Sequence, residues 1–305
     1  PLFVIGANQT PFLTMMGGMR GYKPAAGFEY SMEQYATLEA ASQSGSIFGE
    51  DDAVAGTTAY TYDRAQATNS AQIMLRKINV SYAKAAERAK LSGLSFSTPQ
   101  EFTQSELDFQ TEMALKQLAV DLEYSCLQGV YATKASTSTH SATRGICTAI
   151  EADGTTAVDA GAGTVKVSKA MMDSVSKKMA DAGAPMTTPV IFAGSFQMQQ
   201  LSDLYSWSPV SGSGAGLGGV RVNRIMTQFF EADVVFTPHM PTDAILIADM
   251  DKVSLRGVEV PGKGAIMMEP LGKVGASDAF QIVAHLGMDY ADPKFHGLIY
   301  DLATA

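Results

Sequence analysis

Cysteines are few in this 305-residue chain, and long apolar runs are missing. Its two cysteines, Cys126 and Cys147, exclude a disulfide-built scaffold. Because Cys126 falls on a segment with helical periodicity, we expect free thiols and a reducing compartment. No apolar run reaches the roughly 18 residues that a membrane-spanning helix needs, and no basic segment precedes a short apolar one. The sequence therefore predicts no membrane partner and no secretory signal.

Basic residues are also in short supply. Lys and Arg number 22 against 31 Asp and Glu, which gives a formal net charge of −9 and a pI of about 4.9. Tight wrapping of duplex nucleic acid needs clustered cations that neutralise phosphates. The acidic balance therefore argues against a protein that grips DNA or RNA by its backbone.

Local motifs of catalysis are missing as well: the chain has no P-loop, no zinc ribbon and no H-E-x-x-H. Ser195 lies at an expected strand-to-helix turn, where a hydrolase nucleophile would sit. However, Ala193 and Gln197 occupy positions that a nucleophile elbow fills with glycine. We therefore expect Ser195 to cap a helix. An α/β hydrolase that uses Ser195 with His239 or His285 is the less favoured alternative.

Two short letter patterns match known sites without their context. S-x-x-K occurs at Ser81 with Lys84 and at Ser174 with Lys177, but no K-T-G accompanies either. Residues 214–219 match G-x-G-x-x-G, which in a dinucleotide site follows a strand and precedes a helix. Here an expected helix precedes the glycines and a strand-like segment follows, so we interpret this segment as a loop.

The histidines form no close pair; they are His140, His239, His285 and His296. The best metal-like spacings join His239 to Asp243 and Asp249 to Asp251. Structural histidines and loop carboxylates explain these spacings better than a metal does. The sequence therefore predicts no catalytic, cofactor-binding or metal-binding residue.

The most regular stretch is a predicted long helix over residues 98–128. Thr98 can cap it, Pro99 suits its first position, Glu101 completes a capping box, and Gly129 follows where helices often stop. The predicted apolar face comprises Leu107, Ala114, Leu115, Leu118, Leu122 and Cys126. The predicted polar side comprises Glu106, Asp108, Glu112, Lys116, Asp121 and Glu123.

The segments before this helix have no core of their own. Residues 1–28 are apolar without a clean period, so they must lie on the rest of the chain or on a neighbouring subunit. If they lie on a neighbouring subunit, deleting residues 1–28 is expected to leave a soluble subunit that assembles poorly. In residues 29–80, strand-like stretches at both ends flank a turn-rich tip, Ser42–Gly56. A lone hairpin is marginal in water, so contact with another subunit is expected here too.

A second lobe is predicted over residues 166–254. Ser168 can cap a helix that runs through Ala182, Pro189–Gly194 reads as a buried strand, and Ser195 opens another helix. Strand-like runs follow, which makes a β/α unit. Residues 255–305 alternate strand-like runs again, ending in GLIYDL, and are expected to return to the first lobe.

Taken in order, four stretches carry a resemblance to a known family. They are TPFLTMMGG (Thr10–Gly18), NSAQIMLRKINVS (Asn69–Ser81), AVDLEYSCLQG (Ala119–Gly129) and TRGICTAI (Thr143–Ile150). The chain resembles, over nearly its whole length, the major capsid proteins of tailed bacteriophages with the Hong Kong 97-type fold, and among them the phage SU-ten family. The resemblance implies an α+β subunit with an N-terminal arm, an extended two-stranded loop, a peripheral domain with a long spine helix, and an α/β axial domain. On this sequence the parts correspond to residues 1–28, 29–80, 81–165 with the spine at 98–128, 166–254, and a return to the peripheral domain over 255–305.

The resemblance further implies what the protein does. It implies self-assembly into hexamers and pentamers of an icosahedral shell that encloses a double-stranded DNA genome without sequence-specific contacts. Assembly takes place in the host cytoplasm, with portal, scaffolding and possible decoration proteins as partners. An encapsulin-type cellular compartment with the same fold is the alternative. Some relatives crosslink a Lys to an Asn, but nothing marks such a pair at Lys23, Lys77 or Lys84, so no crosslink is predicted.

Overall fold

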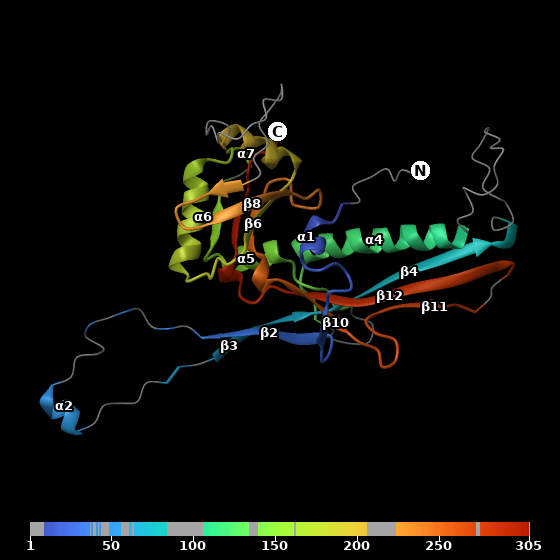
Figure 1. Cartoon of the computed structure of the whole chain (residues 1–305), viewed down its shortest axis with the longest axis horizontal. Coiled ribbons are helices and arrows are strands. Elements are labelled where there is room, and N and C mark those ends of the chain that lie inside the picture. The colour runs from blue at the N-terminus through green and yellow to red at the C-terminus, as the bar shows by residue number, and fades with distance from the viewer. Residues whose placement is uncertain are drawn as a thin grey trace.

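The computed structural model describes residues 9–36, 49–55, 61–62, 64–83, 106–133, 140–161, 163–205, 224–272 and 275–304, with the single residues 38, 41 and 43. The described chain forms two lobes and a long projecting hairpin (Figure 1). One lobe holds a five-stranded sheet, and the other holds a six-stranded sheet. No described helix is long and apolar enough to cross a membrane.

The five-stranded sheet is built around the thirteen-residue strand β12 (Ser277–Asp289). Strand β4 (Gln72–Ser81) pairs with one edge of β12, and β10 (Ser254–Val258) and β11 (Ile266–Pro270) pair with it as well, all antiparallel. Strand β1 (Lys23–Ala25) adds to β10 in parallel. Helix α4 (Glu106–Gln128) lies along this sheet (Figure 1).

The six-stranded sheet separates two cores. Its strands β6 (Pro189–Ala193) and β9 (Ile245–Asp249) are buried on both faces. Ile191 and Ile247 pack into one core with helices α6 (Lys169–Asp181) and α7 (Ser195–Tyr205), whereas Phe192 and Leu246 pack into the other core with α4. The remaining elements of this lobe are β5 (Ala157–Asp159), β13 (Gly297–Tyr300), β8 (Glu231–Phe236), β7 (Arg224–Met226) and α5 (Ile146–Asp153), with the short 3-10 turns η1 (Met250–Lys252) and η2 (Pro293–Phe295).

The long predicted helix is confirmed over α4, and its predicted start at Thr98 lies outside the described residues. Leu118, Leu122 and Cys126 are buried as expected, but Leu115 is 39% exposed and the expectation for it is wrong. Gly129 follows the helix as expected, but close packing of the backbone, and not a left-handed turn, requires glycine at this position. A Cβ at Gly129 would lie 2.4 Å from the carbonyl oxygens of both Ser125 and Thr143, so only glycine allows this close approach.

Two expected strand partnerships are wrong. The hairpin consists of β2 (Glu29–Ala36) and β3 (Arg64–Ser70), while β4, expected to be its returning strand, pairs with β12. The GLIYDL segment does not return to the first lobe, because β13 pairs with β5 and β9 in the six-stranded sheet. In both cases the strands are correctly located, and the partner is chosen by packing between segments distant in sequence.

The N-terminal segment lies on its own chain over the described residues 9–28. Phe12, Leu13 and Met16, in and beside helix α1 (Pro11–Met15), are at most 8% exposed. The ring of Phe12 meets that of Phe192 edge-on with centroids 5.1 Å apart. Deletion of residues 1–28 is therefore expected to unfold the subunit, which corrects the expectation of a soluble, assembly-deficient one.

We expect Phe12→Ala to lower the free energy of unfolding by about 3–5 kcal/mol, because it removes a fully buried ring and leaves a cavity between the lobes. Met15→Ala on the same helix is the matched control, since Met15 is 45% exposed. Urea unfolding followed by circular dichroism measures both. Equal stability of the two variants would contradict the assignment of α1 to the subunit core.

Candidate intersubunit surface

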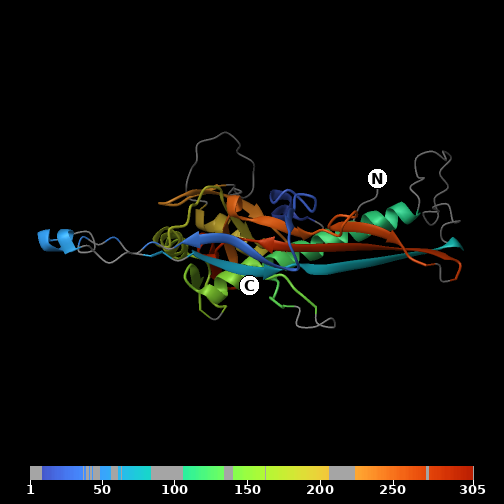
Figure 2. The ribbon, with the colours of Figure 1, turned by 90° about the horizontal axis from the view of Figure 1, so that it is seen from below.

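Between its strands β2 and β3, the hairpin carries several of the most exposed large apolar side chains among the described residues. It projects beyond the two lobes and has the short helix α2 (Glu50–Ala55) near its far end (Figure 2). Leu38, Val54 and Tyr62 are 77%, 86% and 60% exposed. Beyond Met32 its strand residues are exposed or half-buried, because no described element of the chain covers them. A two-stranded ribbon of this kind is stable only against a partner surface.

The root of the hairpin, in contrast, is fixed rigidly. Asn69 is fully buried, and its side-chain amide makes four hydrogen bonds. Nδ2 donates to the carbonyl oxygens of Arg144 and Met288, and Oδ1 accepts from the backbone N–H groups of Arg144 and Ser70. A side-chain amide has two N–H donors and two oxygen lone pairs, so these four bonds use its whole hydrogen-bonding capacity. The direction in which the hairpin leaves the lobe is thereby set by buried polar contacts.

Tyr30 completes the root. Its hydroxyl donates to the Met288 carbonyl oxygen over 2.8 Å, and burial raises the pKa of this phenol well above its ordinary value. A Cβ at Gly287 would lie 2.5 Å from the Tyr30 hydroxyl, so the glycine makes room for the tyrosine. The hairpin is therefore an uncovered two-stranded ribbon whose root is held rigidly by buried polar contacts.

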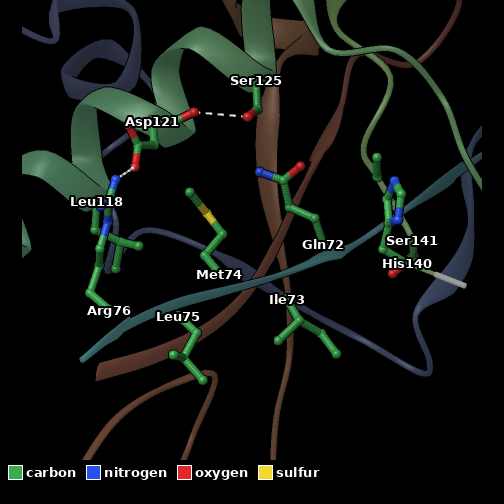
Figure 3. A pocket seen from close by; sticks show the side chains of 11 residues that line it. Gln72, Ile73, Met74, Leu75, Arg76, Leu118, Asp121, Ser125, His140 and Ser141 are labelled. Carbon is green, nitrogen blue, oxygen red and sulfur yellow. Dashed lines mark hydrogen bonds and ion pairs between the residues drawn. The ribbon is translucent and has the colours of Figure 1, made fainter. Parts of the chain in front are cut away.

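A groove of about 340 Å³ runs beside β4. Figure 3 shows Met74 and Arg76 on the side that faces α4, with Ile73 and Leu75 pointing away from it. Arg76 forms an ion pair with Asp121 of α4 across the groove. The other lining residues are Gln72, Leu118, Ser125, His140, Ser141 and Ala142.

The two lobes meet at a buried carboxylate, Glu123 of α4. Oε2 accepts the N–H of Leu13 over 3.0 Å at the start of α1, and Oε1 accepts the Thr237 hydroxyl over 2.6 Å at the end of β8. Burial raises the pKa of Glu123, and these hydrogen bonds oppose the rise. Glu123 was expected on the polar side of the helix, and that expectation is wrong, because the carboxylate joins three segments in the interior.

His296 joins the lobes at a second buried point. Its Nδ1 accepts the N–H of Asp249 in β9 over 3.1 Å, so Nε2 carries the proton and donates to the Tyr290 carbonyl oxygen over 2.9 Å. Protonation of Nδ1 would remove the first bond. Burial lowers the pKa of His296 to about 4 from an ordinary 6.5.

We therefore expect the subunit to lose stability as pH falls from 6.5 to 4. The unfolded chain takes up the His296 proton below pH 6.5, while the folded chain does so only near pH 4, and the difference is worth about 3 kcal/mol at most. Urea midpoints at a series of pH values measure it. His296→Gln is expected to flatten this part of the profile, and His140→Gln, at an exposed position, to leave it unchanged. Identical profiles for all three proteins would contradict the assignment.

Within the described residues, the side chains of the alternative hydrolase site do not come together. Ser195 is exposed and is the first residue of α7. No hydrogen bond within the described residues joins it to His239 or His285. The His285 ring packs edge-on against Phe28, and the carbonyl of His239 accepts from Gln128 Nε2 over 2.6 Å. Lys84 and the glycine-rich residues 208–219 lie outside the described residues.

The metal-like spacings have structural partners. Oδ1 of Asp249 accepts from the backbone N–H groups of Thr188 and Asp251, and Oδ2 accepts from Thr187 N–H. Burial opposes ionisation of Asp249, yet these bonds lower its pKa below the ordinary value. Within the described residues, no three His, Cys, Asp or Glu side chains could hold a metal ion together. Cys126 and Cys147 are buried free thiols, as expected.

One comparison identifies the family of this chain, and the solved structures show its fold. A family model described as SU10 major capsid protein matches residues 1–303. No curated protein sequence matches the chain. The capsid protein of cyanophage A-1(L) superposes with a TM-score of 0.65 at 12% identity, covering 100% of this chain and 95% of that one.

Two further solved structures have the same fold. The capsid protein of cyanophage P-SCSP1u gives a TM-score of 0.60 at 10% identity, covering 98% of this chain and 90% of that one. The SrpI encapsulin of Synechococcus elongatus PCC 7942 gives 0.56 at 8% identity, covering 93% and 85%. At these identities the likeness shows the fold alone, and it confirms the expected Hong Kong 97-type capsid fold.

Proposed function

The chain belongs to the SU10 major capsid protein family, and from this premise we propose that it assembles into hexamers and pentamers of an icosahedral shell around double-stranded DNA. It is a phage major capsid protein. The observation that carries the proposed assembly is the hairpin, which exposes Leu38, Val54 and Tyr62 from a rigid root. Such a surface gains its burial from other copies, and contact between two different patches of one protein gives a ring when the rotation between neighbouring copies closes.

The parts of the subunit take family roles within this proposal. Residues 29–70 form the extended loop. The loop ends earlier than in the expected range of 29–80, because β4 belongs to the five-stranded sheet. That sheet and α4 form the peripheral domain with its spine helix. The six-stranded sheet with α6 and α7 forms the axial domain, to which β5 and β13 contribute. Residues 1–28 keep the name of N-terminal arm, although the described part of the arm packs on its own chain.

The proposal assigns the protein no catalytic role. The shell acts in the virion, and its subunits assemble in the host cytoplasm with a portal protein, a scaffolding protein and, in some shells, a decoration protein. The net charge of −9 supports packaged DNA that is enclosed rather than gripped, because like charges repel.

Electron microscopy of the purified recombinant chain, together with light scattering, tests the proposal. Closed shells or capsomer-sized rings are the expected result. A stable monomer of about 32 kDa, even when scaffolding and portal proteins are co-expressed, would contradict it. Particles isolated from the native source distinguish the encapsulin alternative, because a phage head contains DNA and a portal whereas an encapsulin contains a cargo enzyme.

A further inference from the structure

Glu123 of α4 holds its charge in an unfavourable place. The residue is fully buried, and within the described part of the chain it forms no ion pair with a Lys, Arg or His. Its carboxylate accepts hydrogen bonds from the Leu13 N–H over 3.0 Å and from the Thr237 hydroxyl over 2.6 Å. Both donors are neutral, so the negative charge has no counter-charge when the group is ionised. Burial of such a charge is unfavourable, and a bound proton removes the charge.

The elements around Glu123 supply no compensating charge. Neither residues 10–16, which comprise α1 and its flanks, nor strand β6 contains an ionisable side chain. The titratable groups on the other adjoining segments are Asp121, Tyr124 and Cys126 of α4, Glu231 and Asp233 of β8, and His239 beyond β8. Asp121 pairs with an arginine of β4, and the two acids of β8 pair with Arg224. Burial raises the pKa of the Cys126 thiol far above its ordinary value, so the thiol stays neutral.

The hydrogen-bond partners of Glu123 suit a protonated carboxyl as well as a carboxylate. A backbone N–H only donates, whereas a threonine hydroxyl both donates and accepts. In the protonated state, Oε1–H can therefore donate to Thr237 Oγ1 over the same 2.6 Å, while Oε2 still accepts the Leu13 N–H. This distance suits an O–H···O bond in either direction. A proton can thus be added at Oε1 without breaking either contact.

Docking of α1 contributes to the burial of this carboxylate. Leu13 bonds to it directly, and the neighbouring Phe12 packs its ring against Phe192 of the six-stranded sheet. With α1 docked, burial raises the pKa of Glu123; with α1 lifted away, water reaches the carboxylate and its pKa returns toward the ordinary value. Docking therefore takes up protons over the pH range between the two values. By linkage, α1 docks more strongly as the pH falls through this range.

We propose that Glu123 is a proton-operated joint, which holds α1 tightly against α4 and the six-stranded sheet when its carboxyl is protonated and more loosely when it is ionised. Because Phe12 of α1 packs between the two lobes, the same proton sets how firmly the lobes are held together. The joint is a property of the single subunit. It therefore goes beyond the proposed shell function and does not depend on it.

Amide hydrogen exchange of the unassembled full-length chain, followed by mass spectrometry from about pH 5 to about pH 9, tests the joint. The readout is the protection factor of a peptide that contains residues 11–18, corrected for the intrinsic exchange rate at each pH. Glu123→Gln is the neutral variant, because its amide oxygen can accept the Leu13 N–H and its amide nitrogen can donate to the Thr237 hydroxyl. We expect the ratio of its protection factor to that of the parent to rise with pH by up to about tenfold per pH unit, and then to level off.

Taking a ratio removes the contribution of His296, which acts in the opposite direction and is present in both proteins. Asp108→Asn is the matched control, because Asp108 is an exposed acid on the same helix and its ratio to the parent should stay constant with pH.

Two results would overturn the proposal. One is a Glu123→Gln ratio that does not change with pH, which would show that Glu123 does not titrate with docking. The other is a Glu123→Gln chain that is unfolded or less protected than the parent at every pH, which would show that the joint requires the charged carboxylate. Neither result bears on shell formation, and a chain that forms no shells would leave this test unchanged.

Discussion

Replacing residues 37–63 with a two-residue Asn-Gly turn is expected to abolish shell formation and to leave the subunit folded. The residues that anchor the hairpin lie outside the excised segment, because Tyr30, Asn69 and Ser70 keep all their partners in the lobe. Asn-Gly supports a tight turn between two paired strands. The removed segment includes Leu38, Val54 and Tyr62, whose apolar surface is uncovered within the subunit.

Electron microscopy measures the loss of particles, and circular dichroism measures folding. The melting temperature should change by no more than about 3 °C, which corresponds to about 1 kcal/mol for a chain of this size. Closed shells from the shortened chain would show that the hairpin is dispensable and would remove the main support for the assembly proposal. A collapse in melting temperature would show instead that the hairpin stabilises its own subunit.

Leu118→Asp is expected to prevent folding altogether. Leu118 is 1% exposed on the face of α4 that packs toward β4, and Arg76, the cation that lines the same groove, is already paired with Asp121. Burial of an unpaired charge and the loss of a leucine from the core both lower the free energy of unfolding. Because this free energy is only roughly 5–15 kcal/mol for a domain, the two losses together remove most or all of it. The expected product is insoluble or lacks near-ultraviolet circular dichroism.

Leu115→Asp is the matched control on the same helix. Leu115 lies one turn earlier and is 39% exposed, so the new carboxylate remains in water. Its cost should stay within about 1 kcal/mol, as for most surface substitutions. A cooperative urea transition for Leu118→Asp comparable to that of Leu115→Asp would show that the buried face of the helix has been assigned incorrectly.

Sequence patterns located the elements whose signals are local. Helix α6 begins after Ser168, whose hydroxyl accepts the Met171 N–H as a capping residue should, and Val175 and Met179 are buried as the spacing indicates. Strand β6 is recognisable because Pro189–Ala193 is apolar throughout and a helix follows it. In these segments, propensity, capping and periodicity all favour the same structure.

The features missed were those decided by distant contacts. Glu123 reads as a solvent-exposed acid on an amphipathic helix, and only the N-terminus of α1 and the Thr237 hydroxyl make its burial possible. Helix N-termini attract carboxylates, but the sequence does not say which of the many acids is used. The partner of β4 was missed for a similar reason, because alternation shows that a strand exists without identifying the strand that pairs with it.

The pairing of β4 with β12 has a mechanical consequence for the proposed shell around like-charged DNA. The two strands run antiparallel through ten residue pairs, the longest ladder among the described elements. Because antiparallel hydrogen bonds lie perpendicular to the strands, a pull along them strains every bond of the ladder at once and does not open one bond after another. Helix α4 runs beside the same ladder and is tied to it by the Arg76–Asp121 ion pair. The direction of this ladder is therefore a stiff direction of the subunit, suited to carry tension within the wall of the proposed shell.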